Sequence, residues 1–315
     1  MTSGVAREER RVRSTKPIAS TAPRDAIRRR VERAGEYISL VGDDHEAGAP
    51  GTLAIETRGL TRRFGDVVAV DAVDLAVSAG SVFGLLGSNG AGKSTVIKVL
   101  TTLLAPDAGA ARVAGFDVVA DAMEVRRRIG YVPQLLSADG GLTGRENLEL
   151  SARLHGLSRR ERRERIDDAL RLMGLEADAP RLVRTYSGGM VRRLEIAQSM
   201  LHRPAVLFLD EPTTGLDPVA RRTVHERLRE LRERFGTTML LTTHDMEEAE
   251  TLCDRVAFMA HGRLALEGIP RELEHALGAT ATLEDVFVRA TGGAPPDEGR
   301  YRDVASARRN AARVG

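Results

Sequence analysis

The distribution of apolar residues predicts a parallel β-sheet covered by helices. Four apolar runs read as strands of the sheet: Val82–Leu86, Ala205–Leu209, Thr238–Thr242 and Val256–Met259. Helical stretches separate the last three runs, over 219–234 and 246–252. Strands that alternate with helices in this way are typical of βαβ units, in which both faces of the sheet are covered. The sequence therefore predicts an α/β fold.

Two further patterns flank this core. Before the first buried run, three short strands are expected at Leu53–Thr57, Val67–Val70 and Leu75–Val77. Gly65-Asp66 is a turn signal between the first two, so these strands are predicted to form an antiparallel patch. Another short strand is expected to begin at Ala110.

Residues at about 140–203 have helical periodicity and predict a separate α-helical subdomain. Thr143 followed by Glu146 has the spacing of a capping box for a helix that reaches His155. A second helix is expected over 159–173, and Gly174 is a suitable residue to end it.

The two ends of the chain differ in composition from its middle. The length of 315 residues suggests about two domains or one elaborated domain. We expect a folded domain over 51–268, an N-terminal extension over 1–50, and a short C-terminal region with a flexible tail over 269–315. The extension is basic and then acidic, with few apolar residues, which favours disorder. A contact with a membrane surface or a partner is the alternative.

Composition excludes several classes of protein. The formal net charge is only +2 and aromatic residues make up 3%, with no Trp, so neither a basic field nor a stacking surface indicates nucleic acid. The single Cys253 cannot form an intrachain disulfide and is expected to be a packed thiol in a helix over 247–255. No apolar run is long enough to span a bilayer and no signal peptide is evident, so we expect a soluble chain that needs a partner for any membrane role.

A phosphate-binding loop is predicted directly after the first buried strand. The sequence fits G-x-x-x-x-G-K-[ST] between a strand and a helix. Its residues are Gly87, Ser88, Asn89, Gly90, Ala91, Gly92, Lys93, Ser94 and Thr95. In such a loop Lys93 would reach the β- and γ-phosphates of a nucleotide, and the Ser94 hydroxyl would bind Mg²⁺. The alternative is an ordinary Gly-rich turn before a helix.

Two carboxylates follow the strand 205–209. Asp210 would bind Mg²⁺, and Glu211 would polarise the attacking water beside the γ-phosphate. Ligands bind at the carboxyl ends of strands in open α/β sheets, which supports this interpretation. Acidic residues at this position can also simply cap the next helix.

A third motif, Tyr186-Ser187-Gly188-Gly189-Met190, precedes a helix. Ser187 is a plausible N-cap, although an ordinary cap would need no further function. Together with the loop and the Asp-Glu pair, this motif resembles the nucleotide-binding subunits of ATP-binding cassette (ABC) transporters over Leu53 to Gly268. The resemblance implies a P-loop NTPase fold with a RecA-like parallel-sheet core, an antiparallel β-subdomain and an α-helical subdomain.

The resemblance also assigns roles to single residues. Phe64 matches the aromatic residue that stacks on adenine, and Gln134 matches the glutamine that contacts Mg²⁺ and the attacking water and links to the transport domain. Asp217 matches the loop that crosses the dimer interface, and His244 matches the switch histidine near the γ-phosphate. A single His after a strand is otherwise more often structural.

The family's mechanism would involve two copies of the chain. Two such domains form a head-to-tail dimer around two ATP molecules, so Ser187, Gly188, Gly189 and Met190 would complete the neighbour's site. The resemblance implies ATP and Mg²⁺ as ligands, ATP hydrolysis, a separate transmembrane subunit, and a place on the cytoplasmic face of the membrane.

Departures from the usual motifs indicate a subfamily. Ser88 replaces the usual Pro, and Met190 replaces the usual Gln of the signature. The Tyr-Ser-Gly-Gly-Met form and the stretch Thr282–Phe287 resemble the daunorubicin/doxorubicin-resistance ATPases, which implies export of a drug or another amphiphilic small molecule. Most of the segment that usually precedes this stretch is missing here.

Two other functions compete with export. One is a soluble ABC protein that acts on ribosomes or DNA, but such chains usually carry two cassettes or a long coiled coil, and this chain has one P-loop and no sustained heptads over 134–187. The other is a non-hydrolysing regulatory or assembly module, against which Glu211 and His244 argue.

Overall fold

The computed structural model describes residues 52–292 of the chain. The predicted extension over 1–50 and the predicted tail after Gly292 lie outside the described residues.

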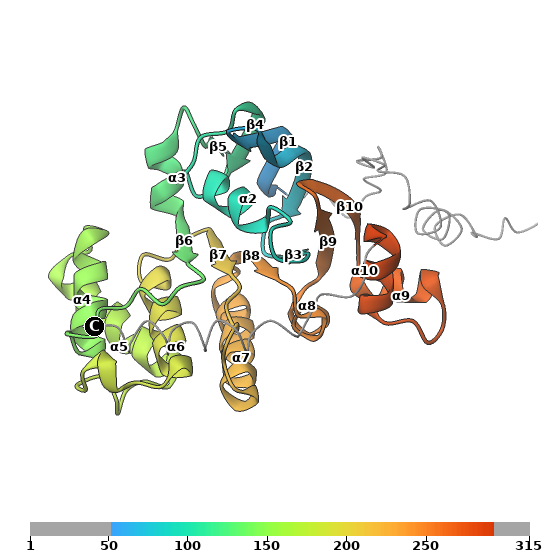
Figure 1. Ribbon diagram of the computed structural model, residues 1–315. Helices are drawn as coiled ribbons and strands as arrows, with labels where there is room; N and C mark the ends of the chain where they lie inside the picture. The colour runs from blue at the N-terminus through green and yellow to red at the C-terminus, as the bar shows by residue number, and fades with distance from the viewer. Residues whose placement is uncertain (1–51, 293–315) are drawn as a thin grey trace, which may run out of the picture.

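A six-stranded sheet forms the centre of the molecule, with strand order β10-β9-β3-β8-β7-β6 (Figure 1). Its strands are β3 (Val82–Leu86), β6 (Ile129–Val132), β7 (Val206–Asp210), β8 (Thr238–Thr243), β9 (Arg255–Ala260) and β10 (Arg263–Gly268). All pairings are parallel except that of the edge strand β10 with β9. The four strands predicted from apolar runs are confirmed with small shifts at their ends, whereas β6 and β10 were not predicted as strands.

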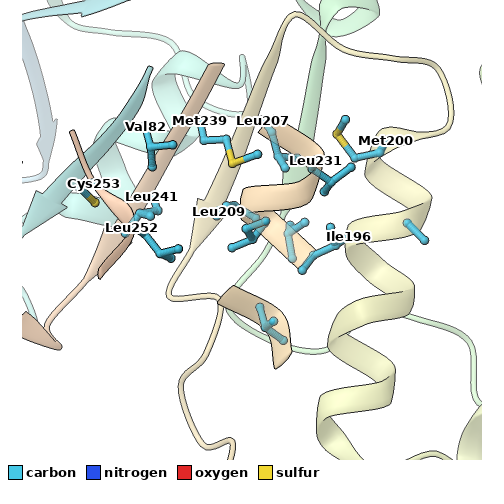
Figure 2. Packing of buried hydrophobic residues seen from close by; sticks show 14 of the residues in the cluster. Val82, Ile196, Met200, Leu207, Leu209, Leu231, Met239, Leu241, Leu252 and Cys253 are labelled. Atoms are coloured by element: carbon cyan, nitrogen blue, oxygen red, sulfur yellow. The ribbon is translucent and has the colours of Figure 1, made fainter. Parts of the chain in front are cut away.

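The two faces of this sheet contribute to two separate cores, as the period-2 alternation of strand side chains requires. On one face, Leu207, Leu209 and Leu241 pack against helices α6 (Gly188–Met200), α7 (Pro218–Phe235) and α8 (Met246–Leu252) (Figure 2). On the other face, Phe83, Phe208 and Leu240 pack against α2 (Lys93–Leu100) and the second sheet. The predicted burial of these strands on both faces is confirmed.

A second, antiparallel sheet has the strand order β2-β1-β4-β5. Its strands are β1 (Leu53–Phe64), β2 (Val67–Ser78), β4 (Ala108–Val113) and β5 (Phe116–Asp117). The prediction of two separate strands over Val67–Val70 and Leu75–Val77 is wrong, because both belong to β2. Register shifts in the β1–β2 ladder and a positive φ of 48° at Ala72 interrupt the apolar alternation while the ladder continues.

Three helices, α4 (Gly144–Leu154), α5 (Arg159–Met173) and α6, lie side by side at one end of the molecule (Figure 1). The predicted capping box is present: the Thr143 hydroxyl accepts from the Glu146 N–H, and the Thr143 N–H donates to the Glu146 carboxylate. Gly174 ends α5 with φ 61°, in the left-handed region where glycine is favoured.

The remaining helices lie at opposite edges of the main sheet. Helix α3 (Ala122–Arg128) lies beside the edge strand β6, whereas α10 (Leu283–Thr291) lies beside β9 and β10 at the other edge, and α9 (Pro270–Leu277) packs against α8 and α10. The Phe287 ring of α10 lies 5.7 Å from the Phe258 ring of β9, so the stretch that resembles the drug-resistance ATPases packs into the core.

Cys253 is buried directly after α8, as expected of a packed thiol, and burial raises the pKa of this thiol. The predicted helix over 247–255 is too long. The observed helix α8 ends at Leu252, because Arg255 already pairs with Phe83 in the parallel ladder between β9 and β3.

Candidate functional site

The phosphate-binding loop connects β3 to α2 at the carboxyl edge of the main sheet. A Cβ on Gly87 would lie 2.3 Å from the Met259 carbonyl oxygen, and one on Gly92 would lie 2.3 Å from the Ala69 carbonyl oxygen. Gly92 also has φ 108° and immediately precedes α2. The loop therefore needs glycine at both positions, because its backbone passes against β9 and β2.

The Lys93 side chain is buried and curls over its own loop. Its ammonium donates to the carbonyl oxygens of Gly87 at 2.7 Å and of Ser88 at 3.1 Å, and it lies 3.7 Å from Glu211 Oε1. Burial lowers the pKa of this ammonium, and the negative charges of Glu211 and Asp210 oppose that shift. The cation is thus held at the edge of the loop with a carboxylate as its counter-charge.

Oxygen atoms of three residues meet beside this loop. The Ser94 hydroxyl donates to Asp210 Oδ1 at 3.0 Å, and the Thr242 hydroxyl donates to the same oxygen at 2.6 Å. A hydroxyl and a carboxylate are hard oxygen ligands that suit Mg²⁺, which takes its remaining ligands from water and substrate phosphates. Ser94 and Asp210 therefore fit the predicted metal site. The Gln134 amide contacts Glu211 instead.

Glu211 lies at the centre of the site, directly after β7. Its backbone has φ 48°, which is uncommon for a residue with a side chain, and its N–H donates to both the carbonyl and the hydroxyl of Thr242 at 3.1 Å. The Gln134 amide and the Thr214 hydroxyl donate to Oε2 at 3.0 and 3.1 Å. Oε1 faces Lys93 and His244 Nδ1, the latter at 3.5 Å.

These contacts set the charge of the two titratable groups. Burial by itself would raise the pKa of Glu211, but the hydrogen bond with His244 and the charge of Lys93 hold it below its usual value. The same hydrogen bond raises the pKa of His244 despite its burial. Glu211 is therefore ionised at neutral pH and can accept a proton or a hydrogen bond from a water.

Phe64 lies at the end of β1, next to the turn that leads to β2. Its side chain is exposed, and the Arg62 guanidinium lies 5.1 Å from the ring centroid. The ring is accessible to a planar ligand, and its stacking on adenine stays a prediction.

The signature motif and Asp217 form a second group, at the adjacent N-termini of α6 and α7. Ser187 caps α6 through its hydroxyl, and Asp217 caps α7 by accepting from the N–H groups of Val219 and Ala220. A Cβ on Gly189 would lie 2.6 Å from the Ala220 Cβ, so this glycine allows the two helices to approach. Gly188, Ser187 and Asp217 are exposed. The predicted residues thus fall into two groups, and the network around Glu211 is made without this second group.

Thr242 and Thr214 belong to the network but were not predicted as site residues. Thr242 is fully buried and pairs with Asp210 in the β7–β8 ladder. A signal for it exists in the sequence, because Thr242 and Thr243 follow the apolar residues 239–241 and stand immediately before His244.

Comparison with known proteins agrees with this geometry. The ABC transporter family matches residues 70–214. The chain is 51% identical to the daunorubicin/doxorubicin resistance ATP-binding protein DrrA of Streptomyces peucetius, over 76% of this chain and 73% of that protein. It is 46% identical to the Nod factor export ATP-binding protein I of Rhizobium sp. (strain N33), over 70% of this chain and 72% of that protein.

Solved structures of similar fold have related descriptions. An ATP-binding subunit of an ABC transporter matches with a TM-score of 0.68 and 31% identity, over 76% of this chain and 99% of its own. The ATP-binding cassette MJ0796 is described as a dimer in a post-hydrolysis state bound to ADP and Pi. It matches with a TM-score of 0.62 and 27% identity, over 68% of this chain and 98% of its own. The chain belongs to the ABC transporter family, as one of its ATP-binding subunits.

Proposed function

We propose that the chain binds ATP with Mg²⁺ at the loop 87–95 and hydrolyses it to drive export through a separate membrane subunit. One observation carries the hydrolytic part. Glu211, ionised and buried, is contacted by Gln134, His244 and Lys93 within 3.7 Å, next to the oxygen ligands Ser94 and Asp210. Hydrolysis of a phosphoanhydride needs a positioned base and charge stabilisation, and this arrangement offers both.

Each residue has a distinct role in this proposal. Glu211 orients the attacking water and takes its proton, and Gln134 holds the Glu211 carboxylate and the water in place. Lys93 and the loop N–H groups bind the β- and γ-phosphates, and a ring N–H of His244 donates to the γ-phosphate. Ser94 and Asp210 would hold Mg²⁺, which supplies charge neutralisation at the phosphates when bound. The Gln134 side-chain oxygen, which is not the atom that contacts Glu211, would be the third protein ligand.

The second group of residues is proposed to act on another copy of the chain. Ser187, Gly188, Gly189 and Met190 lie at the N-terminus of α6, which has a neutral cap and favours an anionic ligand, and Asp217 caps the adjacent N-terminus of α7. Their separation from the Glu211 network is the reason to assign them to the neighbour's ATP in a homodimer. The dimeric description of the MJ0796 structure supports the same arrangement.

A hollow between α4, α6 and the main sheet is the proposed contact with the membrane subunit. It has a volume of about 360 Å³ and is lined by Leu103, Tyr131, Ser151 and His155, among others. Exposed leucines lie on α4, at Leu150 and Leu154, and in the segment between β6 and α4, at Leu135 and Leu136. Residues 52–292 contain no helix that is long and apolar enough to cross a bilayer. We place the chain on the cytoplasmic face of the membrane, held there by its partner.

The transported substrate is proposed to be a drug or another amphiphilic small molecule, because relatives that match most of the chain have names that refer to drug resistance or Nod factor export. The alternative is a non-transport ABC ATPase that acts on a macromolecular complex. Co-expression with a membrane protein encoded beside it, followed by doxorubicin efflux from cells, distinguishes the two. If the chain drives export, it should co-purify with the membrane protein, and Lys93→Ala should abolish doxorubicin efflux. If the chain hydrolyses ATP but associates with no membrane protein, the alternative is favoured.

A further inference from the structure

Two buried side chains of α6 hold the segment that carries Gln134. Arg192 and Glu195 are each only 2% exposed, and their Nη1 and Oε2 atoms form an ion pair at 3.0 Å. They lie one helical turn apart, so both project from the same side of α6 toward the segment 133–138.

Each member of the pair contacts a different part of this segment. Arg192 donates from Nη1 to the Pro133 carbonyl at 2.6 Å and from Nη2 to the Gln134 carbonyl at 2.7 Å. Glu195 Oε1 accepts from the N–H groups of Ser137 and Ala138 and from the Ser137 hydroxyl. The pair thus forms hydrogen bonds to the backbone on both sides of the exposed Leu135-Leu136 dipeptide.

An ion pair at this depth is not explained by stability alone. Removing two charges from water costs about as much as their attraction returns, so apolar residues of similar size often serve a core as well. What this pair supplies is geometry. The planar guanidinium fixes two successive carbonyl oxygens at once, which a point charge cannot do.

We propose that Arg192 and Glu195 are positioning residues that set where the Gln134 amide meets Glu211, and so transmit the orientation of α6 to the hydrolytic site. Ser187 caps the N-terminus of this helix, so a displacement of α6 moves the Gln134 backbone and the signature motif together. The 3.0 Å hydrogen bond from the Gln134 amide to Glu211 Oε2 would then form or be lost as α6 is displaced. The inference rests on the proposed role of Gln134 in hydrolysis.

The test is the paired substitution Arg192→Met with Glu195→Met, which removes both charges and leaves neither one buried alone. Arg193→Met is the matched control, because Arg193 is the next residue of α6 but donates to the Met173 and Gly174 carbonyls inside the helical subdomain. ATPase rates of the full chain with Mg·ATP should give a kcat about tenfold or more lower for the paired variant, with KM little changed. The melting temperature should fall modestly, because four backbone groups of the segment 133–138 lose their side-chain partners. Arg193→Met should keep the wild-type kcat.

A thermodynamic cycle with Gln134→Ala separates positioning from a general structural role. If Arg192 and Glu195 act through Gln134, the paired substitution should lower kcat little further in a Gln134→Ala background. If the paired variant does not fold, Arg192→Lys is tested instead. It keeps the charge but cannot donate to the Pro133 and Gln134 carbonyls at the same time, so it should also lower kcat.

Losses that multiply fully in the Gln134→Ala background, or a wild-type kcat in the folded paired variant or in Arg192→Lys, would overturn this inference and leave the proposed ATPase standing. A wild-type kcat for Gln134→Ala alone would overturn the role of Gln134, and the inference with it.

Discussion

The Thr242 hydroxyl donates a 2.6 Å hydrogen bond to Asp210 Oδ1, between the facing ends of β8 and β7. The same hydroxyl accepts from the Glu211 N–H, so one buried side chain orients both carboxylates of the site. Its position follows from strand register, because Asp210 pairs directly with Thr242.

Thr242→Val should therefore impair hydrolysis more than folding. Valine has nearly the same shape, but it leaves the Glu211 N–H with only the residue-242 backbone carbonyl as acceptor and leaves Asp210 Oδ1 with only the Ser94 hydroxyl as donor. We expect kcat to fall by about tenfold to a hundredfold and the free energy of unfolding to fall by about 1–2 kcal/mol. Steady-state ATPase assays and chemical denaturation measure the two.

Thr238→Val is the matched control for this change. Thr238 lies at the other end of β8, is equally buried, and accepts from the Gly80 N–H, far along the strand from the carboxylates. Thr238→Val should lower the free energy of unfolding by a similar amount and leave kcat unchanged. Equal losses of kcat in the two variants would refute an orienting role for Thr242.

The contact between His244 and Glu211 predicts a pH-dependent contribution to stability. The pKa of His244 is raised above its usual 6.5, so its stabilising effect is full below about pH 6.5 and is lost as pH rises through the folded-state value. The pKa of Glu211 is lowered, so its contribution is present above about pH 4.5 and is lost as pH falls through its folded-state value.

The melting temperature of wild type relative to His244→Gln should thus be highest at about pH 5–6 and should decline toward about pH 8. Thermal denaturation across that range, at constant ionic strength, measures the difference. A difference that grows with pH would contradict the assigned contact.

The close approach of α6 and α7 predicts that Gly189 tolerates no side chain. Gly189→Ala would place its Cβ 2.6 Å from the Ala220 Cβ, so the two helix N-termini must separate. We expect a loss of about 1–3 kcal/mol in the free energy of unfolding, as for other overpacked contacts. In Gly188→Ala the nearest atom, Leu216 Cδ2, would lie 3.5 Å away, an ordinary contact, so stability should change little. Equal losses in both variants would contradict this packing.

Much of the fold could be predicted from local patterns. The strands and helices of 82–100, 159–173 and 206–260 follow from apolar runs and glycine stops, which are local signals, whereas the end of α8 at Leu252 does not. The continuity of β2 could not be predicted, because the ladder with β1 carries the strand across Ala72, where local alternation breaks. The strand β6 has only four residues, too few for a clear apolar pattern, and was not predicted.

The site was predictable to the extent that it consists of motifs. Lys93, Ser94, Asp210, Glu211, Gln134 and His244 were all named from the sequence, and the structure brings them together. The residues that orient them were not found. Arg192 and Glu195 stand in a helix of mixed charge, where nothing in the local sequence distinguishes a buried arginine from a solvated one such as Arg222.

The central claim is that Glu211 is the base that activates water, and Glu211→Gln in the full chain tests it most directly. The amide keeps the size of the side chain but cannot take a proton, so ATP turnover should fall by about a hundredfold or more. Nucleotide affinity should persist, because Lys93 and the loop are intact, and ATP should trap a dimer that light scattering or gel filtration detects. Near-wild-type turnover in Glu211→Gln would contradict the account.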